Sequence, residues 1–448
     1  MKQHPHLACF DSRCGRRYGL NEVVYRCADC GSLLEVANRF NGLDAGSVRE
    51  AWRQRRLSAA KADVSGVWRY REMLPFVTDT DRMVSLPEGN TPLFDAPAAA
   101  SYAGLDRIQF KHQGYNPTSS FKDNGMAAGV TQARIVGASR VACVSTGNTS
   151  ASMAAYAAAA GMQAVIFLPA GKIAYGKLAQ ALEYGALTIQ VDANFDRILA
   201  MIRDLAEELG MYLLNSINPF RIEGQKSIVI ELLDQRGWAV PDWIVLPGGN
   251  LGNISALGKG LRELREAGLI RSLPRVAVIQ AAGSAPFAAQ FRAKGALRPV
   301  RNPETLATAI RIGNPVSWRK AEAALALTDG VATAADEQEI ADAKAIIGRC
   351  GIGCEPASAA TLAGIRNLVR DGTIGRGADV AAILTGHLLK DPDYVYRYHS
   401  GELETPSGDS IRPNFGNAPV SVPYERKRIV GLLQRRDKQA GRRAGVRS

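Results

Sequence analysis

The chain has 448 residues, of which 46% are hydrophobic, so it is long enough for two or three domains around a sizeable core. Its first residues lack the apolar segment of a secretory signal, and the Ala-rich residues 153–171 are interrupted by Gly161 and Pro169, so we expect a cytoplasmic protein without a membrane span. The formal net charge is +12, but residues 426–448 contain nine basic residues and one acidic residue, so the excess charge predicts a solvated tail and not a nucleic-acid-binding protein.

The first thirty residues contain four of the seven cysteines, at Cys9, Cys14, Cys27 and Cys30. Two cysteine pairs separated by twelve residues, with a short strand expected within residues 18–26, are typical of a zinc ribbon. In a chain without a secretory signal, a bound metal explains this spacing better than disulfides do. We therefore predict a zinc-ribbon-like segment over residues 1–40 with a structural zinc ion, and reduced free thiols are the alternative.

The middle of the chain alternates between strand-like and helical segments. Residues 41–85 are expected to form a helical linker, with one or two helices within 45–74. Residues 86–400 then contain six strand-like segments, at 164–168, 187–192, 211–215, 243–246, 275–280 and 379–385, and helical segments at 175–184 and 195–209. This alternation predicts parallel sheets flanked by helices in two lobes, the smaller over about residues 125–215. Residues 401–448 are assigned to a C-terminal extension and basic tail, for which weak contact with a polyanion is the minor alternative.

A lysine lies in an unusual setting at residues 120–123, Ser-Phe-Lys-Asp. On composition alone, Lys122 would be a solvated surface residue. The Ser-Phe-Lys-Asp sequence, however, looks like the segment that anchors pyridoxal phosphate (PLP) as a Schiff base. This lysine therefore suggests both a cofactor and a chemistry, and the downstream motifs decide between the two interpretations.

Two further segments are predicted to place polar loops between a strand and a helix. The loop Ser-Thr-Gly-Asn-Thr (residues 145–149) precedes an Ala-rich helix, whose free N–H groups suit a carboxylate, although plain helix capping explains the same residues. The loop Gly-Gly-Asn-Leu-Gly-Asn (residues 248–253) lets backbone amides approach a phosphate closely. It matches neither the dinucleotide-binding nor the nucleotide-triphosphate loop pattern. The strand ending at Thr385 adds a hydroxyl suited to bond a pyridine nitrogen.

Together these segments resemble the threonine synthase family, in its plant-type branch, from about residue 86 to residue 391. Several other blocks carry the resemblance in the same order, including residues 88–93, 215–226, 309–317 and 355–358. The resemblance implies a two-lobed parallel-sheet α/β fold of the type II PLP enzymes, similar to the tryptophan synthase β subunit. It also implies PLP as cofactor, in addition to the structural zinc ion that the cysteine spacing predicts.

The resemblance assigns a role to each motif. Lys122 would bind the cofactor covalently and move protons, Asn148 would hold the cofactor's 3-hydroxyl, and Thr385 its ring nitrogen. The cofactor phosphate would be bound by Gly248, Gly249, Asn250, Leu251, Gly252 and Asn253. The substrate carboxylate would be bound by Ser145, Thr146 and Thr149, and the substrate phosphate by Asn215, Ser216 and Arg221. Without the resemblance, Arg221 reads equally well as a surface arginine at a helix start.

The implied reaction converts O-phospho-L-homoserine and water to L-threonine and phosphate, by γ-elimination followed by addition of water at the β-carbon. The alternative is a related PLP-dependent enzyme acting on O-phosphoserine, such as a cysteate synthase. Two departures from the family pattern keep that alternative open, because Ser119 and Leu388 replace glycines; in a third departure, Asn124 stands where arginine is frequent. The expected partner is the small-molecule substrate O-phosphohomoserine, a homo-oligomer is an option, and neither nucleic acid nor a membrane is expected.

Overall fold

The computed structural model describes residues 4–40, 42–170, 175–193 and 195–444. Its N-terminal part is a small antiparallel sheet of β1 (His6–Cys9), β2 (Arg17–Tyr18) and β3 (Leu34–Ala37), in the order β2-β1-β3. The strand expected within residues 18–26 is thus only two residues long and begins at Arg17, because the chain turns away at Gly19. The linker forms α1 (Ala45–Arg55), α2 (Lys61–Val64), η1 (Trp68–Met73) and η2 (Thr80–Arg82).

The larger lobe is built on a six-stranded sheet, in the order β12-β11-β10-β13-β5-β4. Its strands are β4 (Leu93–Asp95), β5 (Ile108–His112), β10 (Trp243–Pro247), β11 (Arg275–Ala281), β12 (Val331–Ala335) and β13 (Val380–Leu384). All neighbours run parallel except β4 and β5. The sheet is therefore mixed at one edge only, as parallel sheets with crossover helices commonly are.

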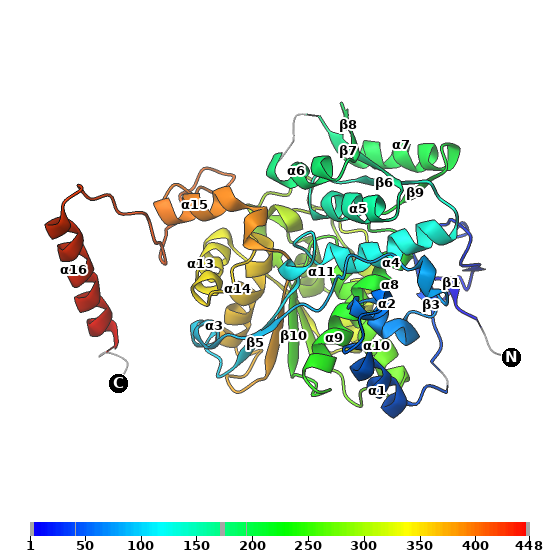
Figure 1. The fold of residues 1–448 in the computed structure, drawn as a ribbon, viewed down its shortest axis with the longest axis horizontal. Helices are drawn as coiled ribbons and strands as arrows, with labels where there is room; N and C mark the ends of the chain where they lie inside the picture. Colours follow the sequence, from blue (N-terminus) through cyan, green and yellow to red (C-terminus); the bar gives the residue numbers. More distant parts are fainter. Residues whose placement is uncertain (1–3, 41, 171–174, 194, 445–448) are drawn as a thin grey trace.

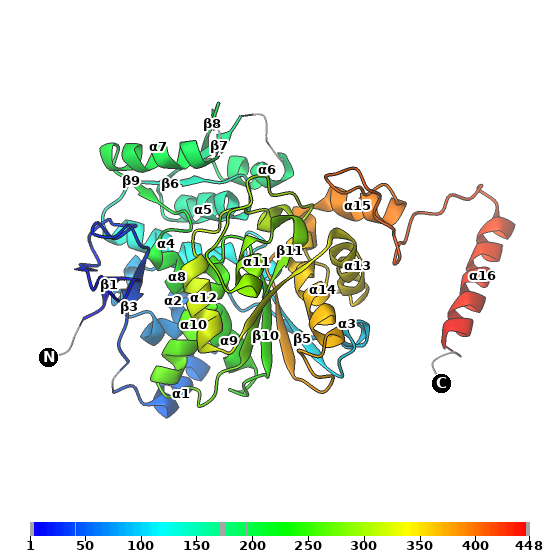
Figure 2. The ribbon, with the colours of Figure 1, turned by 180° about the vertical axis from the view of Figure 1, so that it is seen from behind.

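Alternate residues of the central strands enter two different cores, because successive side chains of a strand point to opposite faces. Ile244 and Leu246 of β10 pack with α9 (Ser227–Gln235), α10 (Gly252–Glu266) and α12 (Trp318–Leu327). Trp243 and Val245 pack with α3 (Pro97–Ala103), α13 (Glu337–Arg349) and α14 (Pro356–Arg370). Figures 1 and 2 show the two helix layers on either side of this sheet. Both faces are covered, which explains why these strands are continuous apolar runs.

The smaller lobe has a four-stranded parallel sheet in the order β8-β7-β6-β9. Its strands are β6 (Arg140–Val144), β7 (Gln163–Pro169), β8 (Leu187–Val191) and β9 (Met211–Leu213). On one face lie α4 (Lys122–Ile135), α5 (Asn148–Ala159) and α6 (Tyr175–Glu183), and α7 (Phe195–Glu208) lies on the other. The helix α8 (Pro219–Gln225) returns the chain to the larger lobe and packs on α4.

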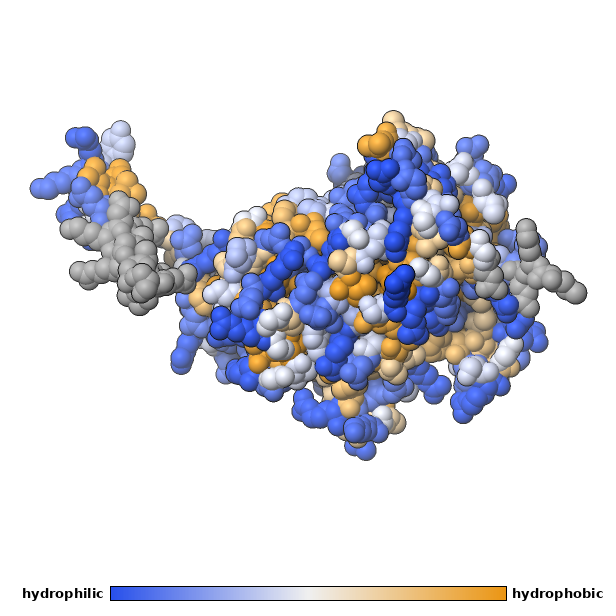
Figure 3. Space-filling view, turned by 90° about the horizontal axis from the view of Figure 1, so that it is seen from below, coloured by the Kyte–Doolittle hydropathy of each residue, from blue (hydrophilic) through white to orange (hydrophobic). Residues whose placement is uncertain are grey.

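After β13 the chain forms η6 (Leu388–Lys390) and α15 (Pro392–Ser400). The body is completed by α11 (Pro286–Ala293), η3 (Gln113–Tyr115), η4 (Ala282–Ser284) and η5 (Thr308–Ile310). Residues 426–435 of the basic tail are mainly exposed, and the tail is helical: α16 (Arg426–Ala444) stands off from the body in Figures 1 and 3. Among the described residues, no helix has the length and apolar character needed to cross a membrane.

Candidate active site

Lys122 is the first residue of α4, and its loop is fixed to the end of β13 in the other lobe. The Phe121 N–H donates to the Thr385 carbonyl oxygen at 2.9 Å, and the His387 N–H donates to the Ser119 carbonyl oxygen at 3.1 Å. Ser119 has a φ of +65°, in the left-handed region that favours glycine. The serine therefore occupies a conformation for which the family's glycine is better suited.

The Lys122 amine is in an environment that favours its neutral form. Burial and the positive charge of Arg221 lower the pKa of Lys122 from 10.5 to about 7, against a smaller opposing effect of Glu355. Its Nζ also lies 4.0 Å from the centroid of the Phe121 ring. A neutral amine is the form that attacks a carbonyl carbon, so Lys122 is suited to covalent chemistry near neutral pH.

Asn148 and Thr385 are brought together by a carboxylate that the sequence prediction did not include. Glu355 is buried, and its two oxygens accept from Asn148 Nδ2 and from Thr385 Oγ1, each at 3.0 Å. A Cβ on Gly386 would lie 2.4 Å from the Glu355 carboxyl carbon, so only glycine fits there. The sequence signal for Glu355 is its place in Glu-Pro-Ala-Ser, immediately before the proline that starts α14.

The Thr385 hydroxyl is bonded to two buried neighbours, Glu355 and Ser358. The Ser358 hydroxyl oxygen accepts from the backbone N–H groups of Thr385 and Gly386, at 2.8 and 3.0 Å, and lies 3.0 Å from Thr385 Oγ1. Thr385 donates its proton to Glu355, so the remaining lone pairs of its oxygen are acceptors. In this arrangement the Thr385 oxygen can accept a hydrogen bond from a further group. Ser358 is, after Glu355, the second residue of the site to which the sequence analysis assigned no role.

The glycine-rich loop at the start of α10 has the features expected of an anion site. Leu251 precedes this helix with a φ of +62° and provides no side-chain cap, so the first N–H groups of α10 are free of a capping side chain. The buried Nδ2 of Asn253 also lacks a partner. A Cβ on Gly248 would lie 2.6 Å from Val278 Cγ2, which explains the glycine at this position. Asn250 instead braces the loop, because it donates to Ser216 Oγ at 2.9 Å and accepts from Val316 N at 2.8 Å.

The loop before α5 has the features expected of a carboxylate site. Gly147 precedes the helix without a side-chain cap, and the residues around it, Ser145, Thr146 and Thr149, are only partly buried. The Ser145 hydroxyl accepts from the Gly147 N–H at 3.2 Å. The buried Asn148 Oδ1 and Ser120 Oγ both lack hydrogen-bond partners. Buried polar atoms without partners are costly, and they indicate that this part of the site is built for a bound group.

Arg221 is a buried arginine without a carboxylate partner among the described residues. It is 2% exposed, its Nη1 donates to the Leu214 carbonyl oxygen at 2.9 Å, and its Nε lacks a partner. Burial lowers the pKa of Arg221 to about 10. An isolated buried guanidinium is unfavourable, so its position is best explained by an anionic ligand.

The two residues grouped with Arg221 in the sequence are bound to protein atoms. Asn215 accepts from the Val144 N–H at 3.2 Å and donates to the Val144 carbonyl oxygen at 3.1 Å, so its side chain ties β9 to β6. Ser216 accepts from Asn250 and thereby links this segment to the glycine-rich loop. Of the three residues, Arg221 is the one with a buried side-chain nitrogen that has no hydrogen-bond partner.

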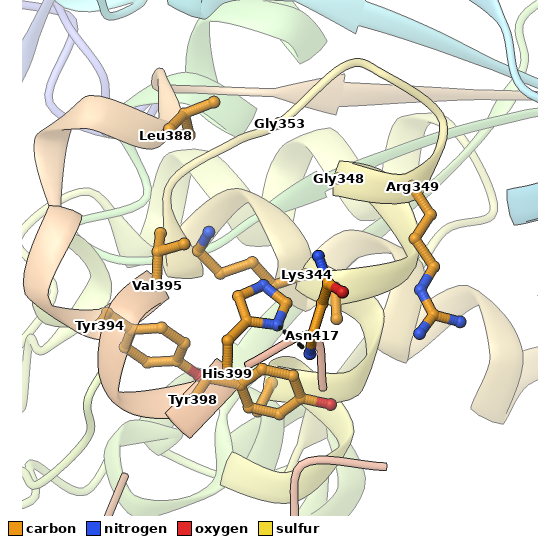
Figure 4. A pocket seen from close by; sticks show the side chains of 12 residues that line it. Lys344, Gly348, Arg349, Gly353, Leu388, Tyr394, Val395, Tyr398, His399 and Asn417 are labelled. Carbon is orange, nitrogen blue, oxygen red and sulfur yellow. Dashed lines mark hydrogen bonds between the residues drawn. The ribbon is translucent and has the colours of Figure 1, made fainter. Parts of the chain in front are cut away.

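The other departures from the family pattern lie in well-packed places. Asn124 is buried, accepts from Asn116 Nδ2 at 3.2 Å and donates to Ser227 Oγ at 3.0 Å. Leu388 lines a separate cavity of about 450 Å³ between α13 and α15, with Lys344, Tyr394 and His399 (Figure 4). A Cβ on Gly353 would lie 2.3 Å from Leu388 Cδ2, so Leu388 is accommodated by the glycine at 353.

The predicted ribbon brings its four cysteines together. The Sγ atoms of Cys9, Cys14, Cys27 and Cys30 all lie within 4.8 Å of one another, an arrangement that is suited to bind a metal ion. None of the cysteines in the described residues forms a disulfide. The other three, Cys143, Cys350 and Cys354, are free thiols in partly or fully buried positions, as expected.

Comparison with known proteins identifies the family. Residues 84–386 match the family described as "Pyridoxal-phosphate dependent enzyme". The threonine synthase of Methanocaldococcus jannaschii is 47% identical over 387 residues, which cover 86% of this chain and 93% of that protein. The chain belongs to the threonine synthase family. The Methanosarcina acetivorans threonine synthase is 46% identical over 87% of this chain and 93% of its own length. Threonine synthase 2, chloroplastic, of Arabidopsis thaliana is 36% identical over 93% and 82%.

The fold also agrees with that of two solved structures. The crystal structure of threonine synthase from Escherichia coli matches with a TM-score of 0.67, covering 87% of this chain and 90% of that chain at 17% identity. The structure of maize serine racemase matches with a TM-score of 0.57 over 66% of this chain. The predicted two-lobed type II PLP fold is therefore confirmed, and PLP is the cofactor that the family implies.

The residues present fit this cofactor. PLP needs a nucleophilic amine, a phosphate site and polar groups along its ring. The lowered pKa of Lys122, the uncapped start of α10 with the unpartnered Asn253 Nδ2, and the unpartnered Asn148 Oδ1 meet these needs. The individual contacts of these residues with the cofactor are part of the proposal below.

Proposed function

We propose that this member of the threonine synthase family converts O-phospho-L-homoserine and water to L-threonine and phosphate, with PLP bound to Lys122. The observation that carries the proposal is Arg221, a buried guanidinium without an acidic partner among the described residues, close enough to lower the pKa of Lys122. The three relatives named above, at 36 to 47% identity, are all threonine synthases, and their names point to the same reaction.

Each part of the site has a task in this reaction. PLP, when bound, supplies an electron sink for negative charge that develops on the substrate carbons. Lys122, with its pKa near neutrality, accepts and returns protons at those carbons. The free N–H groups at the start of α5, with Ser145, Thr146 and Thr149, hold the substrate carboxylate. Arg221 binds the phosphate and stabilises it as it leaves.

Replacing Arg221 by methionine tests the substrate assignment. Charge-assisted hydrogen bonds are each worth about 1.5 to 3 kcal/mol, so Arg221→Met should lower kcat/KM for O-phosphohomoserine by about tenfold to over a hundredfold. Arg134→Met, which changes an exposed arginine on α4, is the matched control and should leave kcat/KM unchanged. PLP content, measured from the absorption spectrum, should be retained in both variants. An Arg221→Met enzyme with wild-type kcat/KM would refute the phosphate-binding role.

A further inference from the structure

The four-cysteine cluster has the geometry of a tetrahedral metal site. Zn–S bonds of about 2.3 Å place thiolates roughly 3.8 Å apart in a tetrahedron. The Sγ atoms of Cys9 and Cys30 are 3.4 Å apart, and those of Cys14 and Cys27 are 3.5 Å apart. The Tyr18 hydroxyl donates toward Cys27 Sγ at 3.5 Å and accepts from the Ala28 N–H at 2.7 Å. Such a donor beside a ligand is the usual outer support of a metal thiolate.

The strand that leaves this cluster is built into the catalytic body. β3 begins four residues after Cys30, and its Leu34 and Val36 side chains are fully buried. Its backbone is held by two buried lysines: Lys320 Nζ donates to the Leu34 carbonyl oxygen at 2.6 Å, and Lys259 Nζ donates to the Val36 carbonyl oxygen. Carbonyl oxygens of the ribbon thus solvate ammonium groups of α12 and α10 that water does not reach.

Beneath β3 lies a buried network of four charged residues, Glu223, Lys226, Lys259 and Glu263. Lys226 Nζ lies 2.7 Å from Glu223 and 2.5 Å from Glu263, and Lys259 Nζ lies 3.1 and 2.8 Å from the same two carboxylates. From the ribbon side, Asn38 Nδ2 donates to Glu223 at 2.8 Å and to Glu263 at 3.1 Å. Buried charges are tolerated only when fully paired, so the network depends on the ribbon staying in place.

The helices that carry this network also carry the candidate active site. Glu223 is two residues after Arg221 in the short helix α8. Lys259 and Glu263 belong to α10, whose first turn follows the glycine-rich phosphate loop. The ribbon touches two more elements of the site: the Leu213 N–H of β9 donates to Tyr25 Oη at 2.7 Å, and Gln132 of α4 donates to the Leu20 carbonyl oxygen at 2.8 Å. One small domain therefore contacts the elements expected to hold the cofactor and both phosphates.

We propose that Cys9, Cys14, Cys27 and Cys30 bind one zinc ion, and that the zinc-closed ribbon holds α8 and α10 in the arrangement that binds PLP. Without the metal, the loops that carry the cysteines are no longer joined, the ribbon sheet includes a strand, β2, of only two residues, and β3 is held less firmly against the body. Release of β3 exposes the buried charges and frees the phosphate loop. Loss of zinc then weakens PLP binding, although the metal does not touch the cofactor.

The test measures metal content and PLP affinity in the full-length protein. Protein purified without chelators should contain about one zinc ion per chain, and a Cys27→Ser, Cys30→Ser variant should contain none. Removing the zinc with a chelator should raise the Kd for PLP at least fivefold, and added zinc should restore it. Cys350→Ser, which changes a thiol outside the ribbon, is the control and should match the wild type. Absence of zinc, or a PLP Kd that stays within twofold after zinc removal, would overturn the proposal.

A second variant distinguishes coupling between the ribbon and the PLP site from unfolding of the ribbon. Asn38→Ala keeps all four cysteines but removes the hydrogen bonds to Glu223 and Glu263. It should keep one zinc per chain and still raise the Kd for PLP severalfold, whereas an unchanged Kd would mean that the network does not connect the ribbon to the cofactor site. Neither readout uses the substrate, so the result does not depend on the proposed reaction.

Discussion

At the residue scale, the environment of Thr385 is the main addition to the sequence-based picture. A hydroxyl at the end of a buried strand was expected to bond a ring nitrogen, and the sequence did not indicate its other partners. In the structure this hydroxyl donates to Glu355, thirty positions away in the chain, and Ser358 lies within hydrogen-bond distance of it. Hydrogen-bond direction depends on such distant neighbours, which no local motif displays.

The pH dependence of PLP capture follows from the pKa of Lys122. Burial and Arg221 lower this pKa to about 7, so the reactive neutral amine is lost as the pH falls below 7 and is fully present above it. The rate of PLP binding to the apoprotein, followed by absorbance, should therefore rise with pH and level off above about pH 8. In Arg221→Met the pKa of Lys122 rises, and the midpoint should move to higher pH. A wild-type midpoint above pH 9 would contradict this assignment.

The strained serine in the Lys122 loop gives a stability prediction. Ser119 has a φ of +65°, which costs a residue with a Cβ about 1 kcal/mol or more. Ser119→Gly should therefore leave the free energy of unfolding unchanged or raise it by up to about 1 kcal/mol, because the flexibility of glycine in the unfolded chain offsets part of the gain. Ser119→Val should lower it by more than 1 kcal/mol. Denaturant unfolding measures the free energy of unfolding of both variants. Equal effects of the two substitutions would show that the backbone strain at residue 119 is unimportant.

At the element scale, the joint between β13 and α14 leaves no room for a side chain. A Cβ on Gly386 would lie 2.4 to 2.6 Å from the Glu355 carboxyl group. Gly386→Ala should displace Glu355 and with it Asn148 and Thr385, and we expect the Kd for PLP to rise by tenfold or more, which corresponds to about 1.4 kcal/mol. Gly377→Ala is the matched control, because a Cβ there meets nothing within 4 Å. Fluorescence titration with PLP measures the Kd of both variants. Equal Kd values for Gly386→Ala and Gly377→Ala would show that Glu355 does not position the cofactor site.

The elements themselves were largely predictable, because their signals are local. The strands at 164–168, 243–246 and 275–280 appear as β7, β10 and β11, each extended by one or two residues. Strand β9 ends at Leu213 and not at residue 215, because Asn215 turns its side chain back to the Val144 backbone. Asn215 was predicted to bind the substrate phosphate, but its side chain is bonded to the Val144 backbone. This contact joins segments far apart in the sequence, so the residue type alone does not indicate it. For Glu355 the error is the opposite one: the sequence assigned it no role, because a buried acid before a helix has no distinctive local pattern.

At the scale of the whole molecule, the two lobes share one site because their parallel strands end toward each other. Asn148 from the smaller lobe reaches Glu355 of the larger lobe, and Ser216 reaches Asn250. Residues 426–435 of α16 are mainly exposed and add positive charge outside this arrangement. The sequence suggested the small lobe, the ribbon and the tail as separate units. The contacts between these units could be identified only from the structure.

The most direct test of the account is the product formed from O-phosphohomoserine by the PLP-loaded protein. Phosphate release and amino-acid analysis should give threonine and phosphate in equal amounts. A parallel incubation with O-phosphoserine and sulfite should give no cysteate. Cysteate from the second mixture, with no threonine from the first, would contradict the proposed reaction and assign the site to the O-phosphoserine chemistry instead.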